Sequence, residues 1–147
     1  MKGFVAMAIG MAVCLGCSVK PEPLRFSVDN CHFCKMTLAD DRFGAELVTT
    51  KGKVFKFDDV KCLTSFLNSD EGKGNEYAFE LVVDYGHEVD EFDLVPAKDA
   101  YYLMSPEVKS PMAGNVAAFR NAVDRARFQK KWNGAAFSWS EVKSALK

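Results

Sequence analysis

The chain has little excess charge of either sign, only two histidines, and no apolar run long enough to cross a membrane. Its 147 residues include 19 basic and 20 acidic side chains, so the formal net charge is -1. This balance argues against a nucleic-acid ligand, and no basic stripe stands out along the sequence. The uncharged run from Phe4 to Leu15 holds about a dozen residues, whereas a bilayer-spanning helix needs about 20.

This apolar run has the layout of a secretory signal peptide, with one positive charge before it and small residues after it. Gly16-Cys17 resembles the lipobox at which bacterial lipoproteins are cleaved and acylated, although Cys14 stands where leucine is usual. We expect residues 1–16 to be a signal peptide and residues 17–25 to be a lipidated N-terminus and spacer. The protein is then exported and lipid-anchored through Cys17 to a bacterial membrane, facing the periplasm. Ordinary cleavage with release into the periplasm is the alternative.

The cysteine count points toward metal chemistry. About 130 residues follow the leader, enough for one compact domain or two small lobes that share a core. With Cys14 removed and Cys17 acylated, Cys31, Cys34 and Cys62 are left. An odd number of thiols in an oxidising compartment leaves at least one unpaired, which favours a thiol that is buried or bound to a metal.

The first half of the mature chain predicts two strands, a helix and a third strand. Residues 43–50 and 53–57 are rich in β-branched and aromatic side chains and are separated by a turn signal. Asp58 then offers a cap for a helix with apolar residues at helical spacing, ending near Asn68. Residues 77–83 follow as a further strand.

The same order of elements returns in the second half. Two strands lead to a helix that Asn121 caps and Gly134 ends, and a last strand and a short helix follow. The expected ranges are 101–104, 116–119, 121–134, 136–139 and 140–146. Each half is too small to bury a core alone. The sequence therefore predicts an α+β fold of two small ββαβ lobes, about 26–86 and 87–147, packed together.

A thiol and thioether cluster follows the leader closely. Cys31, His32, Cys34 and Met36 lie within six residues. Cu(I) is a soft ion that prefers thiolate and thioether sulfur and accepts imidazole. On an extended segment His32, Cys34 and Met36 point to one side, whereas Cys31 joins them only if the segment turns. Zinc sites are built from Cys, His and carboxylates, so Met36 favours copper.

Other uses of a C-x-x-C pair stay open. A thioredoxin-like enzyme needs a long helix that opens at the motif, whereas residues 37–44 run only briefly before a strand. Structural zinc needs two more ligands, and only Cys62 and His87 qualify. We interpret Cys62 as a core residue of its helix. A periplasmic thiol–disulfide oxidoreductase using Cys31 and Cys34 is the rival function, and a plain disulfide is the simplest structural alternative.

Three motifs occur in the order found in the NosL lipoproteins, which this chain resembles over essentially its whole mature length. They are Asp29-x-Cys31-His32-x-Cys34-x-Met36, Phe57-Asp58-Asp59 with Cys62 in the following helix, and Ser110-Pro111-Met112-x-Gly114. The resemblance implies a NosL-like domain over 26–147, with two ββαβ lobes similar to the accessory domain of MerB. It implies a copper chaperone, not an enzyme, that delivers Cu(I) for assembly of the copper–sulfide centre of nitrous oxide reductase.

The resemblance also implies a ligand set. The family's C-x-M pair falls on Cys34 and Met36 as the core ligands, with His32 and Cys31 as further candidates. Met112 matches the family's Pro-Met-Gly element apart from one intervening residue, and its thioether would close the site between the lobes. The alternative is that Met112 is a core or loop methionine. The partners implied are copper, a membrane reached through the lipid anchor, and nitrous oxide reductase or its maturation machinery.

Overall fold

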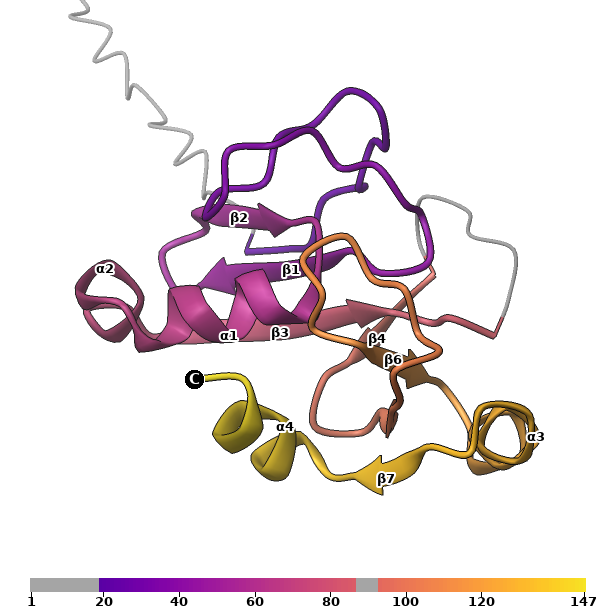
Figure 1. Cartoon of the computed structure of the whole chain (residues 1–147). Coiled ribbons are helices and arrows are strands. Elements are labelled where there is room, and N and C mark those ends of the chain that lie inside the picture. The colour runs from indigo at the N-terminus through magenta and orange to yellow at the C-terminus, as the bar shows by residue number, and fades with distance from the viewer. Residues whose placement is uncertain (1–18, 87–92) are drawn as a thin grey trace, which may run out of the picture.

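A computed structural model describes residues 19–86 and 93–147 of the chain (Figure 1). The expected signal peptide, the lipid site Cys17 and the candidate His87 lie outside the described residues. Within them, no helix has both the length and the apolar character needed to cross a membrane. The elements are β1 (Ala45–Thr49), β2 (Val54–Phe57), α1 (Val60–Asn68), α2 (Asp70–Lys73), β3 (Tyr77–Val83), β4 (Leu94–Pro96), β5 (Tyr101–Met104), β6 (Val116–Phe119), α3 (Ala122–Trp132), β7 (Ala135–Phe137) and α4 (Trp139–Ala145).

The strands form two antiparallel sheets with the same core topology. One sheet has the order β2-β1-β3-β4, and the other has the order β6-β5-β7. In each, the first strand along the chain lies in the centre and pairs with the strands before and after the helix. This confirms the predicted α+β fold of two ββαβ lobes. The short strand β4 was not expected, and it extends the first sheet by pairing with β3 although it follows residue 87.

The two sheets share one main hydrophobic core. On one side of it, the ring of Phe66 in α1 lies 4.7 Å from that of Phe55 and 5.3 Å from that of Phe57. On the other side, Tyr102 of β5 stacks on Trp139 of α4 at 5.5 Å, and both belong to the same cluster of buried residues. Because apolar burial is the main force that stabilises a fold, neither lobe is complete without the other.

The two large helices begin and end close to the predicted positions. Asn121 caps α3 as predicted, and its side chain accepts a hydrogen bond from the backbone N–H of Asp124 at 2.9 Å. At the other end the left-handed residue is Asn133, with φ 47°, and not the predicted Gly134. Gly134 is needed for another reason, because an added Cβ would lie 2.8 Å from a methyl carbon of Leu103.

The cap of α1 also differs by one position. The residue that caps this helix is Asp59, whose side chain accepts from the backbone N–H of Lys61 at 2.6 Å. The predicted cap, Asp58, instead accepts from the backbone N–H of Ala39 at 2.9 Å. Both carboxyl groups are buried. Asp59 therefore fixes the first turn of α1, and Asp58 fixes the segment around Ala39 beside it.

Candidate metal centre

The segment from Cys31 to Met36 turns back on itself. The backbone N–H of Cys31 donates to the carbonyl of Met36 at 2.7 Å, and that of Lys35 donates to the carbonyl of Cys31 at 3.0 Å. Lys35 has φ 67°, the left-handed conformation that closes the turn. Of the two cases that the sequence left open, an extended segment and a turn, the structure has the turn. The turn brings Cys31 beside Cys34, the condition under which Cys31 was expected to join the site.

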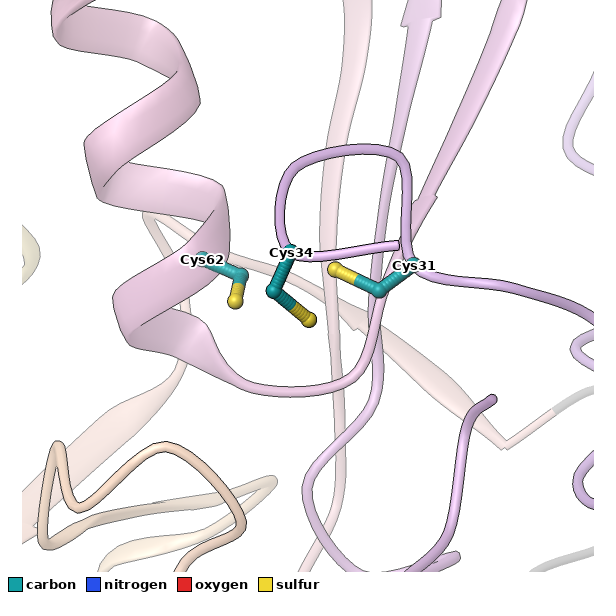
Figure 2. A group of neighbouring side chains, drawn as sticks. All are labelled: Cys31, Cys34 and Cys62. Carbon is teal, nitrogen blue, oxygen red and sulfur yellow. The ribbon is translucent and has the colours of Figure 1, made fainter. Parts of the chain in front are cut away.

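The first turn of α1 adds a third thiol. Figure 2 shows Cys62 projecting from this helix toward Cys31 and Cys34 in the preceding loop. The three Sγ atoms all lie within 4.8 Å of one another, and all three residues are free cysteines. Cys31 and Cys62 are each 1% exposed, whereas Cys34 is partly exposed. Cys62 is buried, which agrees with its interpretation as a core residue. That interpretation did not predict that its sulfur lies close to those of Cys31 and Cys34.

The three thiols are electrostatically unequal. Hydrogen bonds from the thiol of Cys62 and from the backbone N–H groups of Asp58 and Cys34 lower the pKa of Cys31 to about 5, against the opposing effect of burial. Burial raises the pKa of Cys34, and the hydrogen bond to Cys31 raises the pKa of Cys62. The group titrates as a unit in which one thiolate is held by two thiols. Such a buried thiolate attracts a cation, and binding the cation expels the remaining protons.

The two expected thioether ligands differ in burial and come from different lobes. Met36 is 59% exposed, and its backbone N–H faces the sulfur of Cys34. Met112 is partly buried and packs against the core cluster that contains Cys31 and Cys62. The first methionine thus lies at the solvent side of the turn, and the second comes from the other lobe.

His32 lies outside the group of three sulfur atoms. Its Nε2 atom is 3.3 Å from a carboxylate oxygen of Glu71, which also contacts the ammonium group of Lys53 at 3.4 Å. The imidazole makes T-shaped contacts with two aromatic rings, and its centroid lies 4.7 Å from that of Phe55 and 5.2 Å from that of Phe66. The turn therefore directs the side chain of His32 toward α2 and those of Cys31 and Cys34 toward α1.

An ion-pair network holds the base of the turn. Asp29 is 8% exposed and contacts the guanidinium group of Arg25 at 2.6 Å and the ammonium group of Lys56 at 2.7 Å. Burial opposes ionisation of Asp29, but these two cations outweigh it and lower its pKa to about 2. The backbone of Asp29 accepts from Leu38 at 2.9 Å. The two ends of the thiol turn are thus tied together and to β2.

Both the fold and the sequence resemble those of known proteins. The crystal structure of the copper chaperone NosL from Shewanella denitrificans matches this chain with a TM-score of 0.72. The two sequences are 20% identical, and the match covers 84% of this chain and 96% of that chain, so the likeness establishes the fold. No curated protein matches the sequence at a significant level. The NosL family model matches residues 26–147, and the chain therefore belongs to the NosL family.

Proposed function

We propose that this protein is a copper chaperone that binds Cu(I) at the cluster of Cys31, Cys34 and Cys62. The observation that carries the proposal is the convergence of three sulfur atoms within 4.8 Å, since soft thiolate ligands suit monovalent copper. Membership of the NosL family and the fold shared with a protein named as a copper chaperone support the same function. Copper is here a cargo, and the protein acts by binding and handing over, without catalysis.

The unequal exposure of the sulfur ligands suggests how copper is handed over. Cys31 and Cys62 are buried, Cys34 is partly exposed, and Met36 is largely exposed. An incoming donor ligand first replaces the weak thioether of Met36 and then Cys34, while the buried thiolates still hold the ion. The copper is passed by ligand exchange and is never free in solution. Because the thiols must lose their protons to bind, affinity rises with pH.

His32 is a candidate ligand that lies apart from the three thiols. To reach a copper ion at the three cysteines, its imidazole has to leave the carboxylate of Glu71. We propose that the thiolates bind first and that His32 serves only during exchange.

We further propose that lipid on Cys17 tethers the chaperone to a bacterial membrane on its periplasmic side. A lipidated N-terminus raises the local concentration of the chaperone near membrane-bound partners, because the search is confined to a thin layer. The receiving partner we propose is nitrous oxide reductase or its maturation machinery, where Cu(I) is needed for the copper–sulfide centre. Family membership supports this choice of partner.

The rival function, a thiol–disulfide oxidoreductase, needs an accessible attacking thiol. The cysteine with the lowered pKa, Cys31, is only 1% exposed. A turn, and not a helix, follows it. These features favour metal binding over disulfide exchange.

A titration separates the two functions. The purified, reduced protein is titrated with Cu(I) in competition with a chromogenic chelator, alongside Met36→Ala and Cys31→Ser. The chaperone predicts tight one-to-one binding that both substitutions weaken, while Met104→Leu, a methionine of the second sheet, serves as the matched control and binds normally. An oxidoreductase predicts indifference to Met36→Ala and loss of dithiol turnover in Cys31→Ser, and this outcome would contradict the proposal.

A further inference from the structure

A buried carboxylate joins the two lobes beside the thiol cluster. Asp59 is fully buried, and one of its oxygens, Oδ1, caps α1 by accepting from the backbone N–H of Lys61 at 2.6 Å. The other oxygen, Oδ2, accepts from the backbone N–H of Met112 at 3.1 Å. The ammonium group of Lys61 donates to the carbonyl of the same methionine at 3.2 Å. Both backbone polar groups of Met112 are therefore held by the first turn of α1.

The loop that presents Met112 is itself preformed. Ala113 and Asn115 have φ 53° and 55°, the left-handed conformation that L-residues seldom adopt. The loop is closed by Ser110, whose carbonyl accepts from Ala113 at 3.0 Å and whose hydroxyl accepts from Asn115 at 3.0 Å. A Cβ at Gly114 would lie 2.9 Å from Oδ1 of Asp59, so only glycine allows this approach. Figure 1 shows this orange loop rising from the second sheet to α1.

The same turn of α1 carries a thiol of the metal centre. Cys62 directly follows Lys61, and Met112 packs against the core cluster to which Cys62 belongs. We propose that Asp59 is a positioning residue that holds Met112 at the copper site, so that the second lobe adds a thioether to an ion bound by the thiols of the first lobe. This inference rests on the proposed copper function and on Met112 as a ligand, which the family resemblance implies, and it adds the role of Asp59 in holding that residue in place.

The two oxygens of Asp59 have separate tasks, which makes the inference testable. In Asp59→Asn the side chain keeps a single oxygen acceptor, and its amide nitrogen cannot accept from an N–H group. Asparagine caps helices about as well as aspartate, so the start of α1 is preserved. What is lost is the hydrogen bond that fixes the backbone of Met112.

The experiment is a double-mutant cycle on Cu(I) affinity with the reduced full-length protein. The four proteins are wild type, Asp59→Asn, Met112→Leu and the double variant. Each single substitution is expected to weaken Cu(I) binding about 10-fold, as is typical when the support of a ligand is lost. The double variant is expected to bind no more weakly than Met112→Leu alone, because Asp59 acts through the thioether. X-ray absorption at the copper edge is expected to show one Cu–S contact fewer in each variant.

The midpoint of thermal unfolding without copper is also measured for all four proteins. If the role of Asp59 is purely structural, Asp59→Asn lowers this midpoint, and its effect on Cu(I) affinity does not depend on Met112. Additive losses of affinity, or an unchanged sulfur count in Met112→Leu, would overturn the inference while leaving the copper function intact. Absence of Cu(I) binding by the wild type overturns the copper function, and the inference with it. If Asp59→Asn does not fold, Lys61→Gln, which removes only the contact to the carbonyl of Met112, takes its place in the cycle with the same two outcomes.

Discussion

The two lobes share a topology but use it differently. The helix of the first lobe, α1, buries Val60, Cys62, Leu63, Thr64 and Phe66, whereas α3 in the second lobe has no fully buried residue. Phe128 and Trp132 of α3 pack only partly, against a small cluster that includes Phe43 of the first lobe. The repeated topology is therefore not accompanied by repeated chemistry. The first lobe supplies all three thiols and a helix that is buried in the shared core, and the second supplies a helix that packs less deeply.

The central strands show the same contrast. Every residue of β1 is buried, including the ionisable Glu46, one of whose carboxylate oxygens accepts from the backbone N–H of Glu22 at 3.0 Å. Its other oxygen, Oε2, has no hydrogen-bond partner among the residues that the structure describes. In β5 the buried polar residue is Tyr102, whose hydroxyl donates to the carbonyl of Ala97 at 2.7 Å. The first lobe therefore buries a group whose charge changes with pH, and the second buries a satisfied neutral one.

The largest difference between the lobes is expected in stability. Phe66→Ala removes a ring that is 2% exposed and contacts two other aromatic rings, so we expect it to lower the free energy of unfolding by about 3–5 kcal/mol. Phe128→Ala in α3 removes a partly buried ring and is expected to cost clearly less, because less apolar surface leaves the core. Urea unfolding of both reduced variants measures the difference. Equal losses would show that the two helices are equally important to the core.

The second prediction concerns the thiol that the sequence did not assign to the site. Cys62→Ser replaces a soft sulfur with a hard oxygen of similar size, and we expect Cu(I) affinity to fall by more than about 100-fold, beyond the usual cost of losing an outer partner. Thr64→Ser, a buried position of the same helix that keeps its hydroxyl, is the matched control. Chelator competition measures both variants. Normal Cu(I) affinity in Cys62→Ser would show that Cys62 is a core residue and not a ligand.

The third and smallest effect is a pH dependence confined to the first lobe. Burial raises the pKa of Glu46 from 4.5 to about 7, so the folded protein holds this proton more tightly than the unfolded chain. Its contribution to stability is fully present below about pH 4.5 and is lost as the pH rises through 7. Between pH 5 and pH 8 we expect the stability of wild type to fall by on the order of 2–3 kcal/mol relative to that of Glu46→Gln, because every other titrating group is common to the two proteins.

Unfolding free energies across this pH range test the prediction. Tyr102→Phe, the corresponding buried polar position of β5, is expected to leave the pH dependence unchanged. Parallel curves for wild type and Glu46→Gln would mean that Glu46 is ionised within the fold and does not carry the effect.

Most of the secondary structure could be predicted because the strands and the two long helices carry clear periodic patterns. Two elements escaped prediction, and both are short. The strand β4 has three residues and the helix α2 has four, too few to show any period. Residues 69–75 are mostly polar and show no apolar pattern, although Ser69 caps α2 by accepting from the backbone N–H of Gly72 at 3.1 Å.

The metal centre could be predicted in part. The cysteine count and the Cys-x-Met motif pointed to a thiol site, but the sequence gives no sign that Lys35 adopts a left-handed conformation, since glycine usually marks such turns. Without that turn, neither the approach of Cys31 to Cys34 nor the path of His32 toward Glu71 can be derived. The approach of Cys62 depends on tertiary packing, which local patterns do not encode.

One contact on α1 bears on the order in which the protein folds. The hydroxyl of Thr64 donates to the carbonyl of Leu146 at 3.0 Å, a link between positions 82 residues apart. The helix that carries Cys62 therefore gains this partner only after α4 has been made. Contacts between distant positions form late because a long loop must close first. Until that contact forms, the helix that carries Cys62 is held less firmly, and we expect a chain truncated before α4 to form wrong disulfides under oxidising conditions more readily than the chain that includes α4.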